Sequence, residues 1–377
     1  MGWVILFAGK RAMALPDVLV VGAGVIGLST ARELSTRGCR VTVVSRDEPG
    51  SGASAVSAGM LELHYPHPIP EPLVPLCEYS RSLYDGLARD LRAETGMDIS
   101  LDTSGTIAVA LSMEEASGLE AQAAAIPQSR LLPDPEEWKE LEPGLGPGIR
   151  AALLLPDDHH VSPRRLCSAL LLSCERRGVS IVRGVTVRSV LAREGKAEGV
   201  ETSAGPMKAG CTVLAAGSWA GGIAGLPGPL PVRPVRGQIL SLEMRNLPRH
   251  VIQHQKVYLV PRPYEGRLAV GATVEEAGFD DRPTAGAAAG LATEGTRLFP
   301  SLADARFVAL EVGLRPGSKD DLPILGATPF AGLLLAAGHF RKGILLAPAT
   351  AHAIADLVAG SRPAVSLDLF SAGRFAS

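Results

Sequence analysis

Three glycines at positions 22, 24 and 27 form the first chemically suggestive pattern in the chain. They lie in the stretch VVGAGVIGLS, which follows a predicted strand over 17–22 and opens a predicted helix over 25–37. Gly22 permits a tight turn, Gly24 lets a phosphate approach the backbone, and Gly27 lets the helix pack on the strand. The free N–H groups at the start of such a helix attract an anion. The pattern predicts a site for the pyrophosphate of a dinucleotide.

The end of the second predicted strand, over 40–44, is where such a site holds the ribose of the nucleotide. A carboxylate is usual at this point, but the chain has Ser45 followed by Arg46 and Asp47. An arginine beside the ribose suits the additional phosphate of NADP. On this feature alone, both NADP and FAD remain open.

Three other features favour FAD. The glycine turn lies close to the N-terminus, and the small-residue loop GSGASAVSAGML at 50–61 can run beside a bulky cofactor. A second glycine-bearing strand end, VLAAGSWAG at 213–221, comes far downstream, where the returning chain would cross the nucleotide. Only Arg46 supports NADP.

The remaining pattern alternates between two kinds of structure. Strand–helix–strand patterns over 17–75, 150–220 and 310–377 predict an α/β fold with a discontinuous, Rossmann-like FAD-binding domain. Residues 76–149 and 221–309 are predicted to form an antiparallel-β substrate-binding domain. The proline-rich segment 64–75 is interpreted as a connector, because proline does not fit inside a helix or a central strand. Further helices are predicted at 76–95, 113–124, 135–142, 162–178 and 284–299, and a last one follows the turn GHFRKG.

Length and composition exclude several classes of protein. A chain of 377 residues exceeds one compact core, and a net charge of −2 disfavours nucleic-acid or anionic-membrane partners. Residues 1–16 are interpreted as an N-terminal extension with Met13 as an alternative start, and the apolar stretch 2–9 is too short to span a bilayer. The five cysteines are scattered and odd in number, which predicts reduced, mostly buried thiols in a cytoplasmic protein. No metal site is predicted.

The chain resembles the FAD-dependent family that contains glycine oxidase and D-amino-acid oxidase. The resemblance covers nearly everything from 17 to 360 and rests on VVGAGVIGLSTARELSTRG, GSGASAVSAGML, VLAAGSWAG, YLVPR, GRLAVGAT, GLRPGSKDDLPILG and GHFRKGILLAP. It implies a D-amino-acid-oxidase-like fold and non-covalent FAD. It also implies oxidative deamination of glycine, sarcosine or D-alanine by hydride transfer, with oxygen reduced to hydrogen peroxide, a role in making the thiazole of thiamine, and a homo-oligomer. The alternatives are an oxidase or dehydrogenase for larger D-amino acids, and a non-catalytic FAD-binding subunit.

The resemblance assigns roles to individual residues. Arg315 is expected to clamp the substrate carboxylate with help from the Tyr258 hydroxyl, Arg341 to border the entrance, and Val274 to line the substrate cavity. In the stretch VGLRPG, Arg315 follows an apolar strand and is predicted to precede a Pro-Gly turn. Contacts to FAD are expected from Gly22, Gly24, Val25, Ile26, Gly27, Ser45, Arg46, Ala53, Ser54, Ala58, Gly59, Met60, Val187, Ala216, Gly217, His339, Phe340, Arg341, Lys342, Gly343, Ile344 and Leu345.

Other candidates have plainer interpretations. The DDHH stretch at 157–160 contains metal-ligand residue types, but its spacing does not suit one helix face, so a solvated loop is expected. His339 is expected to be structural, because hydride transfer from a neutral amine needs no base. Trp219 is expected either to cover the cofactor or to pack.

Overall fold

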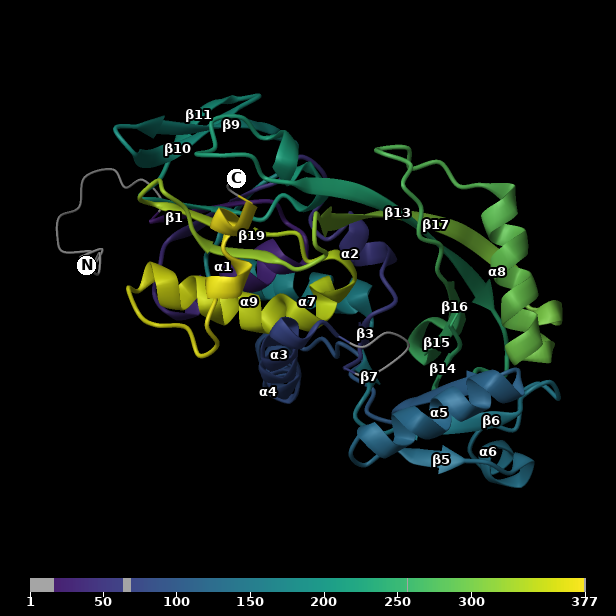
Figure 1. The fold of residues 1–377 in the computed structure, drawn as a ribbon. Coiled ribbons are helices and arrows are strands. Elements are labelled where there is room, and N and C mark those ends of the chain that lie inside the picture. Colours follow the sequence, from purple (N-terminus) through teal and green to yellow (C-terminus); the bar gives the residue numbers. More distant parts are fainter. Residues whose placement is uncertain (1–16, 64–68, 256, 376–377) are drawn as a thin grey trace.

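The computed structural model describes residues 17–63, 69–255 and 257–375, so the predicted N-terminal extension and the first half of the proline-rich connector lie outside it. Two sheets dominate the described part of the chain (Figure 1). The chain passes from one sheet to the other and back several times, as the interleaved pattern predicts.

The first sheet has the strand order β18-β19-β12-β1-β2-β8. Its strands are β1 (Val18–Val21), β2 (Val41–Val44), β8 (Ser180–Val182), β12 (Cys211–Leu214), β18 (Ile324–Ala327) and β19 (Leu333–Ala337). All neighbours are parallel except β18 and β19. The central strands β1 and β12 are buried on both faces, which explains why they read as continuous apolar runs.

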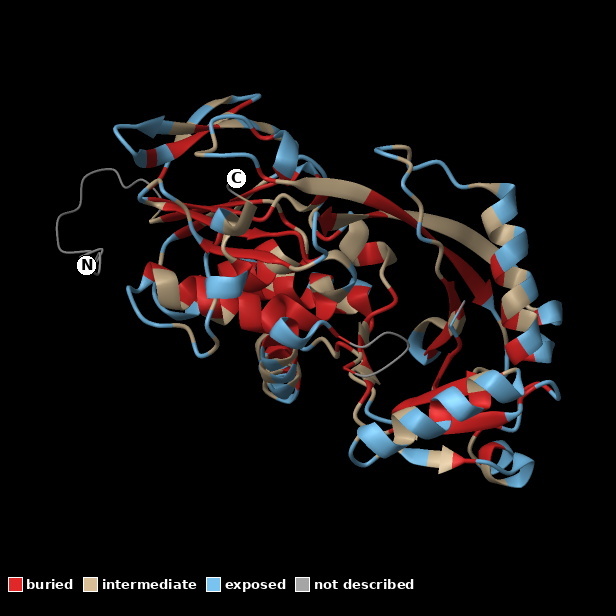
Figure 2. Ribbon diagram, viewed as in Figure 1, coloured by how far each residue is buried: buried red, intermediate tan, exposed pale blue. Residues whose placement is uncertain are grey.

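Helices and a small sheet cover the two faces of this first sheet. On one face lie α1 (Val25–Thr36), α7 (Pro163–Arg176) and α9 (Gly343–Val358), which share a core with β1 and β12. On the other lies a three-stranded sheet of β9 (Val187–Arg193), β10 (Lys196–Thr202) and β11 (Gly205–Lys208). Figure 2 shows the helices of the first layer buried along most of their length. This is the predicted Rossmann-like arrangement.

The second sheet has the order β17-β13-β16-β15-β14-β4-β6-β5. Its strands are β4 (Thr106–Ala110), β5 (Arg130–Leu132), β6 (Ala151–Leu155), β13 (Val232–Glu243), β14 (Val251–Gln253), β15 (Tyr258–Arg262), β16 (Arg267–Gly271) and β17 (Arg306–Ser318). The pairing is antiparallel except between β4 and β14. Three helices accompany it: α5 (Met113–Ala125), α6 (Pro135–Leu141) and α8 (Ala285–Leu298).

The division into two domains remains a prediction, and the packing bears on its boundaries. The predicted helix over 76–95 is two helices, α3 (Val74–Ser82) and α4 (Tyr84–Thr95). Both contribute to the core around the first sheet, where α3 contacts α9 and α4 contacts α7. Strand β6, in contrast, joins the second sheet although it was predicted within the FAD-binding segment. These contacts favour moving 74–95 to the first domain and 151–155 to the second.

Helix α9 contains Pro348 in its interior, and side chains from α3 and α4 bond to the backbone of its first turns. Proline lacks an N–H, so the carbonyl of Ile344 loses its helical partner. The buried Tyr84 hydroxyl donates to that carbonyl instead. Ser80 Oγ donates to the Leu345 carbonyl at 2.5 Å and accepts the N–H of Ala349 at 3.2 Å. The first turns of α9 therefore depend on two hydroxyls from elsewhere in the chain.

None of the helices in the described ranges is long and apolar enough to cross a membrane.

Replacing Tyr84 by Phe should lower the free energy of unfolding by about 1–3 kcal/mol, because the Ile344 carbonyl is left buried without a donor. Chemical denaturation followed by circular dichroism measures this. Tyr79→Phe is the matched control: its hydroxyl pairs with His352 Nδ1 at 3.0 Å at a half-buried site, so its loss should cost less than about 1 kcal/mol. Equal losses for the two variants would contradict the assignment.

Candidate active site

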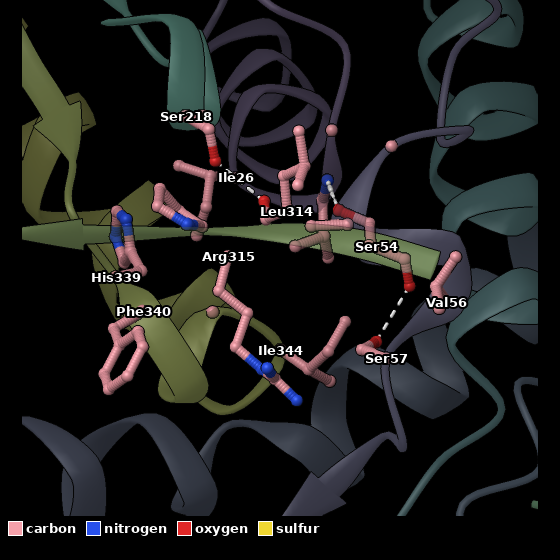
Figure 3. A pocket seen from close by; sticks show the side chains of 18 of the residues that line it. Ile26, Ser54, Val56, Ser57, Ser218, Leu314, Arg315, His339, Phe340 and Ile344 are labelled. Carbon is pink, nitrogen blue, oxygen red and sulfur yellow. Dashed lines mark hydrogen bonds between the residues drawn. The ribbon is translucent and has the colours of Figure 1, made fainter. Parts of the chain in front are cut away.

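The candidate site is a cavity of about 700 Å³ between the two sheets. One side is formed by the carboxyl ends of β1, β2 and β12, where ligands bind in open α/β sheets. The other side is formed by residues of β13, β15, β16 and β17, and the start of α9 closes one end. Figure 3 shows side chains that line this space, among them Ile26 of α1, Ser54 of the loop after β2 and Ile344 of α9. Arg315 of β17 projects into the same space.

The glycine turn is built as the sequence pattern predicts. Gly22 has φ +105°, and a side chain there would run into the Ala215 carbonyl of β12. Gly24 precedes the first turn of α1 and faces the cavity, while Gly27 packs directly on the Gly22 carbonyl behind the turn. The Val25 N–H is bonded to Ser54 Oγ at 3.0 Å, so loop 50–61 lies across the start of the helix. The open backbone and the helix N-terminus fit a pyrophosphate group.

The far end of the cavity carries the residues predicted at the ribose. The buried Ser45 hydroxyl donates to the Asp47 carbonyl at 2.7 Å. The Arg46 guanidinium pairs with the Asp47 carboxylate at 2.7 Å and lies over the Trp219 ring at 4.1 Å. A 2′-phosphate would have to compete with Asp47 for Arg46, which removes the main argument for NADP. Trp219 also contacts Phe279, with ring centroids 5.6 Å apart, so this end joins the loop after β16.

Arg315 lies inside β17, and the prediction of a Pro-Gly turn directly after it is wrong. The strand continues through Pro316 and Gly317 to Ser318. Pro316 is opposite Pro234 of β13, outside the part of β13 that pairs with β16, so its missing N–H interrupts no ladder with a third strand of the sheet.

The Arg315 guanidinium is bound by backbone carbonyls. Its Nη1 donates to the Thr273 carbonyl at 3.0 Å and to the Arg236 carbonyl at 3.4 Å. Burial lowers its pKa, and the nearby Tyr258 acts in the opposite direction. Within the ranges that the structure describes, no carboxylate forms an ion pair with Arg315. A partly buried guanidinium left in this way is suited to pair with an anionic group.

Tyr258 stands beside Arg315, and two glycines make room for the pair. Burial raises the pKa of Tyr258, so its hydroxyl remains a donor at neutral pH. A side chain at Gly237 would collide with the Arg315 guanidinium, and one at Gly271 with the Tyr258 ring. Neither glycine is evident as a site residue from sequence, because only the register of β13, β16 and β17 brings them under these side chains.

Arg341 and Val274 lie at the exposed margin of the cavity. Arg341 is exposed and stacks on Phe340 with its guanidinium carbon 5.1 Å from the ring centroid. Val274 is 51% exposed and follows Thr273, whose carbonyl holds Arg315. His339 is buried, its Nε2 lies 3.0 Å from Thr350 Oγ1, and burial lowers its pKa to about 3. A histidine that stays neutral in this way agrees with a structural role.

The predicted cofactor contacts fall into two groups. Gly27, Lys342 and Leu345 do not line the cavity: Gly27 lies behind the turn, Lys342 bonds to Glu62, and Leu345 is in the core. The lining residues among them are Gly22, Gly24, Val25, Ile26, Ser45, Arg46, Ala53, Ser54, Ala58, Gly59, Met60, Val187, Ala216, Gly217, His339, Phe340, Arg341, Gly343 and Ile344. Glu62 and Gln253 also line it and were not predicted.

The DDHH stretch is not the solvated loop that the sequence analysis expects. Asp158 is fully buried and accepts the Leu63 N–H at 2.7 Å, and His160 is buried in β7 (His159–His160) against β3 (Met60–Leu61). Burial raises the pKa of Asp158 to about 7. No group of metal-ligating side chains occurs in the described ranges. The stretch is a buried structural element behind the cavity.

Together, the glycine turn, the cavity and the partly buried guanidinium fit the site of a flavin-dinucleotide oxidoreductase. Residues 17–357 match the model of the FAD dependent oxidoreductase family, DAO, and the chain belongs to this family.

Relatives and solved structures agree with this assignment. The chain is 37% identical to a glycine oxidase of Pseudomonas aeruginosa, over 92% of this chain and 96% of the relative. It is also 37% identical to a bifunctional protein ThiO/ThiG of Synechocystis, over 95% of this chain. The chain spans about half the length of that relative, since 54% of it is covered. The crystal structure of glycine oxidase from Geobacillus kaustophilus matches with a TM-score of 0.89 at 34% identity, over 94% of this chain and 98% of that structure.

Gly24→Ala should raise the dissociation constant for FAD at least tenfold with little effect on the apoprotein's stability. The added methyl group would lie 3.3 Å from Ser54 Oγ and would obstruct approach to the helix N-terminus. Flavin fluorescence titration of the apoprotein measures the constant. Gly86→Ala, in α4 with open space around it, is the control and should leave FAD binding unchanged. Unchanged binding in Gly24→Ala would place the pyrophosphate elsewhere.

Asp158→Asn should stabilise the protein increasingly as pH rises from about 4 to about 7. The unfolded carboxyl ionises near pH 4, whereas the folded one keeps its proton to about pH 7. Because the folded pKa is raised, this group lowers the free energy of unfolding by roughly 1.4 kcal/mol per pH unit across that window. Denaturation midpoints at pH 4.5, 6 and 7.5 test this. Asp157→Asn, at a site 39% exposed, is the control; parallel pH profiles for wild type and Asp158→Asn would refute it.

Proposed function

We propose that this protein oxidises the Cα–N bond of glycine and of small D- or N-methyl amino acids. The net reaction converts amino acid, oxygen and water to 2-oxo acid, hydrogen peroxide and an amine, with the imine formed first and then hydrolysed; the amine is ammonia from a primary amino acid and methylamine from an N-methyl one. The observation that carries the proposal is Arg315, a partly buried guanidinium in the cavity that no carboxylate pairs with in the described ranges. The relatedness to proteins named glycine oxidase supports the same substrate class.

The residues of the chain bind and orient the substrate. Arg315, held by two backbone carbonyls, presents its remaining N–H groups to the substrate carboxylate, and Tyr258 donates its hydroxyl to the same group. The apolar walls around Ile239 and Ala272 exclude water from the Cα. No side chain in this arrangement is needed to remove the Cα proton, and the neutral, bonded His339 is not placed to do so.

FAD would be held by the glycine turn and by the start of α9, and when bound it supplies the acceptor for the hydride from the substrate Cα. Gly343 and Ile344 bring the first N–H groups of α9 to the cavity. A helix N-terminus at this point stabilises negative charge that develops nearby. The hydrogen bonds that Tyr84 and Ser80 donate to the carbonyls of Ile344 and Leu345 hold these first turns of α9 in place.

We also propose that the product serves thiamine formation, as the family resemblance implies, with the imine from glycine incorporated into the thiazole. The bifunctional ThiO/ThiG relatives support this, since this chain matches 54% of the length of one of them at 37% identity. The exposed Val274 supports an alternative, oxidation of larger D-amino acids, because the cavity wall there opens to solvent.

The deciding experiment is the visible spectrum of the purified holoprotein without oxygen, before and after adding glycine. Bleaching of the flavin band by glycine or sarcosine supports the proposal. A band that persists with glycine but bleaches with D-alanine or D-proline favours the alternative. A band that no amino acid bleaches would overturn both.

Arg315→Ala should raise the KM for glycine about 100-fold or more while FAD content stays unchanged, because a buried charge-assisted contact worth about 3 kcal/mol is lost. Steady-state oxygen consumption and the ratio of flavin to protein absorbance measure the two quantities. Arg341→Ala is the comparison: its guanidinium is exposed, so its loss should raise KM less than tenfold. An unchanged KM in Arg315→Ala would remove the clamp assignment.

A further inference from the structure

Glu62 is an acidic residue on the cavity wall that the proposed chemistry does not use. Along 60–63 the side chains alternate, as expected for an extended segment. Leu61 and Leu63 are buried in the core of the first domain, whereas Met60 and Glu62 line the cavity. The Glu62 side chain is only 14% exposed. Its carboxylate therefore lies on the cavity wall and is largely shielded from bulk water.

Two side chains hold Glu62 in this position. Gln253 Nε2 donates to Glu62 Oε2 at 3.1 Å. Lys342 Nζ donates to the Glu62 carbonyl at 3.1 Å and lies 3.4 Å from Glu62 Oε1. Of the two ion-pair partners, Glu62 lines the cavity and Lys342 does not. The negative end of the pair thus faces the cavity, and the positive end stands behind it.

Glu62 is linked to the substrate end of the cavity through Gln253, which bonds its carboxylate and lies opposite Tyr258 in the register of β14 and β15. Burial is the main cause of the raised pKa of Tyr258; Arg315 lowers that pKa, and Glu62 raises it. The Tyr258 hydroxyl thus lies within the influence of a buried cation and of an anion. Arg315 attracts a carboxylate, and Glu62 disfavours a second one nearby.

We propose that Glu62 is a specificity-determining residue that restricts the site to amino acids with a single carboxylate. This inference rests on the function proposed above. The part of the cavity at Arg315 receives the substrate carboxylate, and the part at Glu62 accepts neutral or cationic groups. A second carboxylate, on the nitrogen or on the side chain, meets the Glu62 charge in a poorly solvated space. Lys342 does not line the cavity, but its positive charge lies next to the Glu62 carboxylate and reduces this repulsion.

The test compares sarcosine with iminodiacetate, which is sarcosine with a carboxylate on its N-methyl group. The measured quantity is the ratio of kcat/KM for iminodiacetate to that for sarcosine in the holoenzyme. Glu62→Gln keeps the shape and an oxygen for Gln253, removes the negative charge, and should raise this ratio at least tenfold. Lys342→Met leaves Glu62 uncompensated and should lower the ratio. Glu78→Gln removes an exposed carboxylate outside the cavity and should leave the ratio unchanged.

Opposite shifts from the two members of one ion pair distinguish charge from packing. If Glu62→Gln and Lys342→Met change the ratio in the same direction, or if Glu62→Gln leaves it unchanged, the proposal is overturned. If the FAD-loaded protein oxidises neither sarcosine nor glycine, the proposed function fails. The role of Glu62 in charge selectivity can then still be tested by ligand binding. The dissociation constants of acetate and malonate, followed by the flavin spectrum, then replace the rates. Glu62→Gln should strengthen malonate relative to acetate at least tenfold, and an unchanged preference refutes the assignment.

Discussion

The burial of Arg315 is the constraint on which the rest of the site depends. Taking a guanidinium out of water costs several kcal/mol unless its donors are bonded, and here two backbone carbonyls bond only part of it. Those carbonyls come from β13 and from the segment after β16, so the cation is tolerated only if three strands keep their register. Gly237 and Gly271 are required for the same reason, because each lies under a side chain of the clamp. The donors that remain are available to an anionic group, as the proposed substrate carboxylate requires.

The two ends of the cavity use different physical means to bind their ligands. At the glycine turn, backbone N–H groups and the α1 dipole are fixed parts of the main chain, and no charged side chain contributes. At the opposite end, Arg315 and Glu62, a cation and an anion that are both partly buried, line the cavity together with Tyr258. The first arrangement suits a cofactor that remains bound, since its groups need little reorganisation. The second suits a small molecule that must be distinguished from others by its charge.

The sequence predicts the nucleotide-binding half well and the substrate half only in part. Gly22, Gly24 and Gly27 are local signals, because strand, turn and helix follow one another in the chain, and the structure confirms the turn. From sequence we expect Arg315 at the end of a strand, because Pro316 and Gly317 resemble a turn. The pairing of β17 with β13, which accommodates these two residues inside a strand, joins segments far apart in the chain and has no local signal. Glu62 could have been found from the alternation of Met60, Leu61, Glu62 and Leu63. Its link to Lys342 joins residues far apart in sequence and has no local signal. The burial of Asp158 is equally tertiary, because charged residues are usually solvated.

The order of strands in the first sheet has a consequence for how the protein emerges from the ribosome. Strand β12 ends at Leu214, and its outer neighbour β19 begins only at Leu333, after most of the second sheet has been made. During synthesis, β12 therefore presents an open, apolar edge through the whole translation of the intervening strands. Such edges recruit other chains. A truncated chain that stops before β19 would keep this edge exposed, so the nucleotide-binding half is not obtained by cutting the chain at a single point.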